Sequence, residues 1–139
     1  MSGWPERVRP GQPDDADNAL RRIIYALAIT DEEKDAFERR FDVQLTNLYG
    51  LTEAMVLVML APLFGENRWP SVGLPIGERE VRVVTEDDAD AAPGEVGEII
   101  VRGVPVQSLM KGYYKNPEAT ARSVRGSWLY ANDRRRPPR

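Results

Sequence analysis

Two apolar runs separated by a helix signal limit the folds open to this chain more than any other feature of its sequence. Residues 23–28 are apolar on both faces, as in a strand that helices cover on each side. Thr30 and Glu33 then form a capping-box pattern, which predicts the start of a helix. Residues 43–49 alternate as a second strand before Gly50 breaks the pattern. Strand, helix and strand within about 30 residues predict a βαβ unit with parallel strands, and hence an α/β fold.

The second half of the chain has the pattern of a small antiparallel β subdomain. Residues 80–85 and 98–102 are predicted strands, and Pro93-Gly94 marks a turn between them. The acidic stretch 86–90 suggests a calcium loop at first sight. It lacks the spaced ligands, central glycine and terminal glutamate of such a loop, so a solvated hairpin tip is the favoured interpretation.

The rest of the sequence completes this organisation. Asn116 and Pro117 predict the start of a short helix through Val124, and residues 128–130 follow as a brief strand. The expected parts are a flexible leader over residues 1–18, an α/β part over 19–77, a β-rich part over 78–133 and a disordered basic tail over 134–139.

Composition excludes several kinds of chemistry. The 139 residues include no Cys and no His, which removes disulfides, zinc-thiolate sites and the usual general base. A formal net charge of −3 argues against a nucleic-acid groove. The longest apolar run, residues 54–61, is too short to span a bilayer and is expected to be buried core that Pro62 ends, with a lipid or partner helix as the alternative. The first residues lack the apolar region of a signal peptide, so a cytoplasmic protein without a membrane span is expected.

A ring, a flexible turn, a hydroxyl and a carboxylate follow one another at the end of the second predicted strand. These are Tyr49, Gly50, Thr52 and Glu53. The carboxyl ends of strands in open parallel sheets are where ligands bind, and these are groups that a nucleotide site uses. The alternative is a plain helix start, with the hydroxyl capping backbone N–H groups and the acid at the positive helix end.

Four stretches in a fixed order favour the nucleotide site. Tyr49 to Glu53 resembles the Y-G-x-T-E signature of the adenylate-forming superfamily, which includes acyl-CoA synthetases, luciferases and peptide-synthetase adenylation domains. Later matches occur at residues 94–99, 111–120 and 128–133. The resemblance runs from Asp17 to Asp133 and is closest to the carnitine and crotonobetaine-CoA ligase branch. It implies a fragment of the large amino-terminal domain of such an enzyme.

The resemblance also implies what these residues do. Family enzymes join a carboxylic acid to the α-phosphate of ATP and then pass the acyl group from AMP to a thiol, usually that of coenzyme A. Thr52 would hydrogen-bond the α-phosphate, and Glu53 would hold Mg²⁺ through a carboxylate oxygen. The implied nucleotide-binding set is the ring of Tyr49 against adenine, the backbone of Asn47 and Leu48 at the base edge, the Gly50 turn, Thr52, and Asp133 at the ribose hydroxyls.

The match to the family is incomplete. Ala131-Asn132-Asp133 stands where the family has T-G-D, and these residues contain neither a glycine-rich phosphate loop with its lysine nor a lysine-bearing carboxyl-terminal domain. The isolated chain is therefore expected to be inactive. The alternative function is a non-catalytic nucleotide-binding or interaction module. Trp69 is read either as a packing residue or as a substrate contact.

Overall fold

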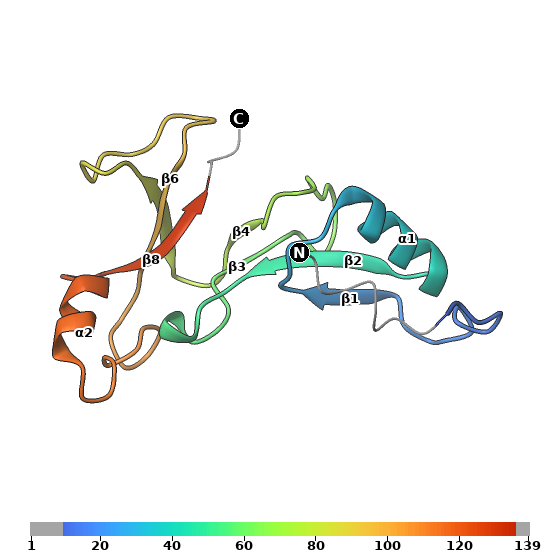
Figure 1. The fold of residues 1–139 in the computed structure, drawn as a ribbon, viewed down its shortest axis with the longest axis horizontal. Coiled ribbons are helices and arrows are strands. Elements are labelled where there is room, and N and C mark those ends of the chain that lie inside the picture. The colour runs from blue at the N-terminus through green and yellow to red at the C-terminus, as the bar shows by residue number, and fades with distance from the viewer. Residues whose placement is uncertain (1–9, 136–139) are drawn as a thin grey trace. The chain divides into compact units, whose positions relative to one another are not determined.

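The computed structural model describes residues 10–135, which form helices and two β-sheets (Figure 1). The chain divides into two compact units, one up to Thr46 and one from Asn47 onward. Strand β2, Gln44–Tyr49, crosses that division. The combination of helices and sheets confirms the predicted α/β class. The sequence-based division at residue 77 falls where the chain leaves the first sheet, between β4 and β5.

The first unit contains the predicted strand, helix and strand. β1 is Arg22–Tyr25, α1 is Asp31–Phe41, and β2 follows. The β1 and β2 arrows point the same way in Figure 1, as a βαβ unit requires. The capping box is confirmed: the Thr30 hydroxyl accepts a hydrogen bond from the Glu33 backbone N–H at 3.2 Å, and the Glu33 carboxylate accepts one from the Thr30 N–H at 2.8 Å.

Strand β1 differs from its prediction in length and in cover. It ends at Tyr25 instead of Ala28, and the side chains of Ile24 and Leu27 are 48% and 53% exposed. Among the described residues of this unit, α1 is the only helix, so cover on both faces is not found there. A cavity of about 330 Å³ lies beside α1, lined mainly by apolar side chains, including Ile23, Tyr25, Phe37, Phe41 and Leu45.

Short antiparallel strands open the second unit. β2 pairs with β3, Met59–Leu60, which pairs in turn with β4, Leu74–Pro75. The apolar run 54–61 was expected to be buried throughout, and only part of it is. Ala54, Val58 and Ala61 are buried, whereas Met55 and Val56 are 46% and 66% exposed because they form a turn.

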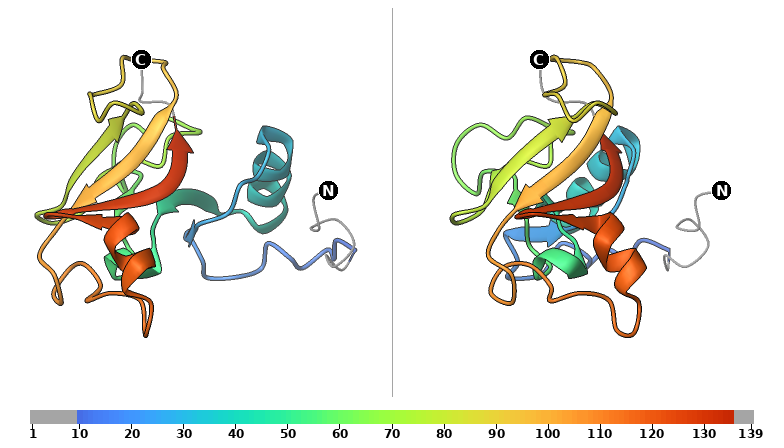
Figure 2. Two further views of the ribbon diagram at one scale, coloured as in Figure 1. Left: turned by 60° about the vertical axis from the view of Figure 1, so that its left-hand side comes forward. Right: turned by 90° about the vertical axis from the view of Figure 1, so that its left-hand side faces the viewer.

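A second sheet follows in the strand order β5-β6-β8-β7 (Figure 2). The predicted hairpin is confirmed as β5, Glu80–Val84, and β6, Gly97–Arg102. Helix α2, Pro117–Ser123, begins as predicted, with the Asn116 side chain accepting a hydrogen bond from the Ala119 N–H at 3.0 Å. After β7, Val124–Arg125, strand β8 runs from Trp128 to Arg135 and so extends beyond the predicted brief strand.

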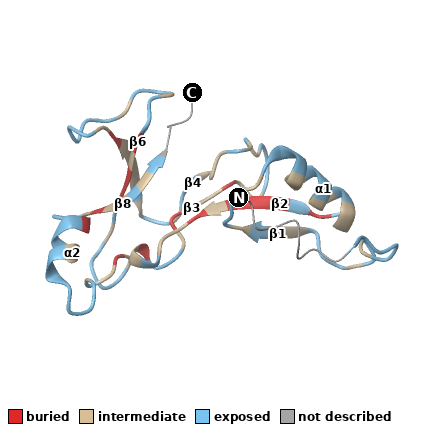
Figure 3. Cartoon of the chain, viewed as in Figure 1, coloured by how far each residue is buried: buried red, intermediate tan, exposed pale blue. Residues whose placement is uncertain are grey.

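The inner face of this second sheet supplies the core of the unit. Ile99, Val101 and Leu129 are at most 2% exposed and pack with Tyr49, Ala54, Val58 and Leu109 (Figure 3). On the other face, the guanidinium groups of Arg82 and Arg102 lie 5.4 and 5.9 Å from the centre of the Trp128 ring. The residues that end β2 are thus built into the same core as the second sheet.

The acidic stretch forms a hairpin tip, which agrees with the favoured prediction. Asp90 pairs with Arg82 at 2.7 Å, Glu86 pairs with Arg134 at 2.9 Å, and Asp88 accepts a hydrogen bond from the Tyr130 hydroxyl at 2.9 Å. Among residues 10–135, no cluster of three acidic, His or Cys side chains could hold a metal ion. Nor does this part of the chain contain a helix long and apolar enough to cross a membrane.

Candidate functional site

Three of the predicted site residues, Gly50, Thr52 and Glu53, lie in a tight turn that reverses the chain after β2. The Val58 N–H donates to the Tyr49 carbonyl at 3.0 Å, and the Val56 N–H donates to the Leu51 carbonyl at 2.8 Å. Gly50 lies so close to the returning chain that an added Cβ would be 1.5 Å from the Val56 carbonyl oxygen. Only glycine fits there, and the turn places Thr52 at its exposed end beside Glu53.

This turn is a single short 3-10 turn, Thr52–Ala54, and no longer helix follows it. Its cap residue is Leu51, with no side-chain capping hydrogen bond. The alternative prediction, in which the Thr52 hydroxyl caps a helix, is therefore not found. Met55 and Val56 have φ angles of 54° and 72°, in the left-handed region that costs a β-branched residue most. The chain thus holds strained backbone directly beside its candidate site.

Two donors from elsewhere in the second unit hold the turn. The Met110 N–H donates to the Glu53 carbonyl at 2.7 Å, and the Arg79 guanidinium donates to the Ala54 carbonyl at 3.1 Å. Ala54 is fully buried, so its methyl group anchors the turn in the core. Two hydrogen bonds and one packed methyl group therefore fix the backbone that carries the Glu53 side chain.

The carboxylate of Glu53 does not point into packed hydrocarbon. It is half-buried, and its Oε1 accepts a hydrogen bond from the Tyr113 hydroxyl at 2.8 Å. This bond is the main cause that raises the pKa of Tyr113 above its ordinary value, burial adding to it, while a hydrogen bond with Ser123 acts in the opposite direction. Glu53 is thus placed as an accessible carboxylate at the exposed end of the turn.

The ring of Tyr49 and the amide of Asn47 are much less accessible. Tyr49 is 6% exposed and lies in the core cluster, and Asn47 is 9% exposed. The Asn47 carbonyl accepts a hydrogen bond from the Ala61 N–H at 2.9 Å, and Leu48 pairs with Leu60. Stacking of adenine on Tyr49 stays a prediction, and it requires one face of that ring to be uncovered.

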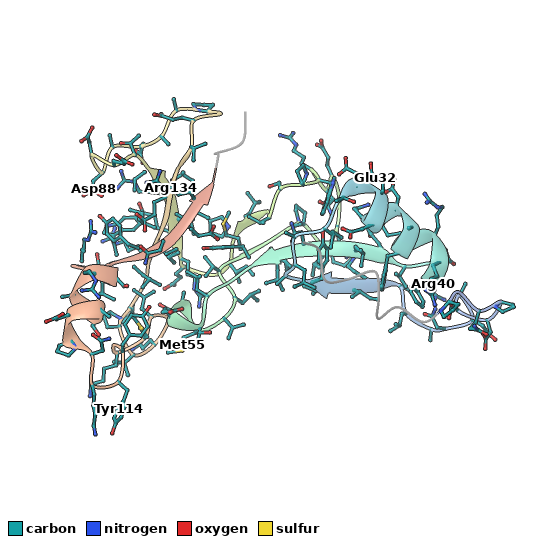
Figure 4. All side chains as sticks on the ribbon, in the orientation of Figure 1. Glu32, Arg40, Met55, Asp88, Tyr114 and Arg134 are labelled. Carbon is teal, nitrogen blue, oxygen red and sulfur yellow. The ribbon has the colours of Figure 1, made fainter. Side chains whose placement is uncertain are left out.

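Asp133 lies on β8, Trp128–Arg135. Beside it, the Asn132 N–H donates to Glu98 at 2.8 Å and Arg134 pairs with Glu86. Figure 4 shows Arg134 near Asp88, at the hairpin end of the second unit, and Met55 toward the end that carries Tyr114. That Asp133 and Glu53 meet around one nucleotide stays a prediction.

The carboxylate of Glu53 suits a magnesium ion that the protein and its substrate coordinate together. Mg²⁺ keeps several waters and is usually held by one or two carboxylates together with substrate phosphates. A single accessible carboxylate beside the Thr52 hydroxyl suits that arrangement, whereas a site made by protein ligands alone would need a cluster that residues 10–135 lack. Glu53 would hold the ion, and Thr52 would face the phosphate.

Sequence reasoning missed three members of this site: Arg79, Met110 and Tyr113. Residues 111–120 were recognised as part of a family pattern, but nothing in the local sequence connects Tyr113 to a carboxylate 60 residues away. Lys111 and Lys115, which flank this part of the loop, are both exposed.

Comparison with known proteins identifies the class to which this fold and turn belong. The sequence matches the AMP-binding enzyme family over residues 6–114, and the chain therefore belongs to that family. It is 37% identical over 127 residues to the crotonobetaine/carnitine–CoA ligase of Citrobacter koseri, covering 91% of this chain and 25% of that protein. The ligase of the same name from Salmonella arizonae is 36% identical over 121 residues, which cover 86% of this chain and 23% of that protein.

A solved structure agrees with this assignment. A benzoate CoA ligase from Burkholderia xenovorans superimposes with a TM-score of 0.79 and 25% identity, over 91% of this chain and 25% of that one. The resemblance found in the sequence motifs is thus confirmed. The chain spans about a quarter of the length of the curated relatives it matches.

Proposed function

We propose that this chain is part of an ATP-dependent acyl-CoA ligase, which activates a carboxylic acid as acyl-AMP and transfers it to coenzyme A. The observation that carries the proposal is the fixed turn after β2, which presents a hydroxyl and an accessible carboxylate side by side in a chain of the AMP-binding family. Relatives named as CoA ligases support the same reaction class.

The residues of the turn have separate parts in this function. Bound Mg²⁺ would supply neutralisation of charge on the phosphate oxygens of ATP. Glu53 would hold that ion through its carboxylate, and the Thr52 hydroxyl would donate a hydrogen bond to the α-phosphate. Asp133 binds the ribose hydroxyls, and Tyr49 with the Asn47–Leu48 backbone and Gly50 lines the adenine end. The substrate class that the relatives' names suggest is a carboxylic acid such as crotonobetaine or carnitine.

A chimera tests this proposal. Residues 19–133 replace the homologous segment of the Citrobacter koseri relative, and carboxylate-dependent exchange of pyrophosphate into ATP is measured. We expect exchange in the folded chimera and a loss of about a hundredfold or more when Glu53→Gln is added, because the developing charge loses a preorganised partner. The control is Glu66→Gln, which changes an exposed acid paired with Arg68.

The isolated chain provides the second arm of the experiment. We expect negligible exchange from it, because positioning of the nucleotide depends on parts of the family domain outside these residues. Exchange well above a Glu53→Ala control would contradict that expectation. A chimera that melts cooperatively but shows no exchange would refute the proposed function and favour a non-catalytic nucleotide-binding module.

A further inference from the structure

Tyr113 makes the contact that fixes how the Glu53 carboxylate lies. Its hydroxyl donates to Oε1 at 2.8 Å. Among the described residues, this is the only hydrogen bond that the carboxylate accepts. The second carboxylate oxygen, Oε2, is left to other ligands. One hydroxyl therefore decides the orientation of the group that the proposed function assigns to a metal ion.

Tyr113 is itself held by helix α2. The Tyr113 backbone N–H donates to the Thr120 hydroxyl at 2.9 Å, and that hydroxyl donates to the Asn116 carbonyl at 2.9 Å. Gly112, with a φ angle of 150°, passes so close to the helix that an added Cβ would be 3.0 Å from Thr120 Cγ2. Ser123, at the end of α2, is buried and acts to lower the pKa of Tyr113. The loop thus presents Tyr113 from a packed support.

Tyr114, the next residue, has no comparable contact with the turn. It is 87% exposed, stands at the outer end of the loop in Figure 4, and has the Lys115 ammonium group 5.2 Å from its ring centre. The two neighbouring tyrosines therefore differ in the one respect that matters for the site, namely contact with Glu53. This difference supplies a matched control.

We propose that Tyr113 is a positioning residue for the Glu53 carboxylate, holding Oε1 so that Oε2 faces a divalent cation. The inference rests on the proposed function, since it presumes that Glu53 binds a metal ion. Carboxylates that ligate metals are usually hydrogen-bonded in turn, and loss of such an outer partner weakens metal binding by about 10- to 100-fold. An inhibitory contact, in which the hydroxyl competes with the metal, makes the opposite prediction: removing it would tighten binding.

Methionine methyl groups provide a local readout of metal binding. The chain has four methionines, and two of them flank the carboxylate. Met55 is two residues from Glu53, and the Met110 N–H donates to the Glu53 carbonyl. In the intact chain labelled with ¹³C at the methionine methyls, the Mn²⁺ complex of ATP is titrated, because the phosphates complete the proposed metal site, and the paramagnetic broadening of these two resonances is followed. Mn²⁺ bound at distant acidic groups broadens these two resonances little, because the broadening falls steeply with distance.

The variants are Tyr113→Phe, Tyr114→Phe, Glu53→Gln and the Tyr113→Phe/Glu53→Gln pair. We expect Tyr113→Phe to raise the Mn²⁺ midpoint about tenfold. Tyr114→Phe should leave it unchanged, and Glu53→Gln should abolish the broadening so that the pair shows nothing further. Thr120→Val should weaken binding in the same direction by freeing the Tyr113 backbone, while Thr120→Ser, which keeps the hydroxyl, should restore it.

Each result is decisive. An unchanged or lower midpoint in Tyr113→Phe, with broadening still dependent on Glu53, overturns the positioning inference and leaves the proposed function standing. Broadening that is absent in the wild-type chain, or that Glu53→Gln does not reduce, refutes the metal-binding role of Glu53 and the inference with it. The Met59 methyl resonance reports whether a variant keeps its fold. If Tyr113→Phe does not fold, the comparison of Thr120→Val with Thr120→Ser tests the positioning role of Tyr113 in its place.

Discussion

Replacing Gly50 with alanine should damage the site turn far more than the size of one methyl group suggests. The added Cβ would lie 1.5 Å from the Val56 carbonyl oxygen and 2.7 Å from the Val56 carbonyl carbon. Real contacts of this kind are not closer than about 3 Å, and both atoms belong to backbone that cannot rotate away. Relief therefore requires the returning chain to move, which separates Val58 from the Tyr49 carbonyl. Overpacking a well-packed site costs about 1–3 kcal/mol and sometimes more, and a backbone clash should fall at the upper end.

The matched control is Gly77→Ala. Gly77 has a φ angle of 65°, and an added Cβ would meet nothing within 4 Å, so alanine there carries only the cost of left-handed backbone, about 1–2 kcal/mol. Denaturant unfolding and thermal unfolding of the intact chain, both followed by circular dichroism, measure the free energy of unfolding and the melting temperature of each variant. At about 4 °C per kcal/mol, Gly50→Ala should lower the melting temperature by about 12 °C and Gly77→Ala by about 4–8 °C. Equal losses would show that the close approach at Gly50 does not exist.

Two further predictions concern the cores of the two units. Leu129→Ala should destabilise the chain by about 2–5 kcal/mol, because Leu129 is 1% exposed in the core of the second unit. The control is Leu74→Ala, at a side chain 67% exposed, which should change the free energy of unfolding by less than about 0.5 kcal/mol in the same denaturant titration. Burial, with the charge of Glu38 adding to it, raises the pKa of Tyr25 to about 12 from its ordinary 10.0, so folding favours the neutral phenol. The stabilisation from the neutral phenol is complete below pH 10, the pKa in the unfolded chain, and is lost as the pH rises to about 12. Tyr25→Phe should remove this loss from the pH dependence of the melting temperature. The same pH dependence in wild type and variant would contradict the prediction.

Features that depend on near neighbours in the chain were predictable from the sequence. Thr30 and Glu33 are three residues apart, so a capping box between them needs no knowledge of the fold. The β5–β6 hairpin likewise follows from two predicted strands with a Pro-Gly turn between them. In each case the stabilising contact is formed by residues that the local pattern already brings together.

Features that depend on tertiary context were not predictable in the same way. Thr46 and Asn47 are polar residues of a strand predicted from alternation, yet both are buried, at 0% and 9% exposed. Polarity alone could not show that neighbouring segments cover them. Tyr113 could not be connected with Glu53, because the contact requires both the turn after β2 and the loop before α2 to be in place. The extension of β8 to Arg135 similarly depends on pairing with β6, which overrides the basic composition of that segment.

The position of Glu53 should therefore respond to changes in the core that never touch it. Strained backbone at Met55 and Val56 persists only where the surroundings hold it, and here Ala54 anchors the turn in the same cluster as Leu129. A cavity made in that cluster would weaken the packing of Ala54 and let the strained residues relax, which would change the direction of the Glu53 carboxylate. The hydrogen bond from Tyr113 would oppose that change. The backbone that carries Glu53 is anchored by the packed methyl group of Ala54, and the carboxylate is held by Tyr113 in the loop before α2, so its geometry depends on both supports together. Loss of Tyr113 should accordingly affect metal binding more in a chain whose core has already been weakened than in the intact one.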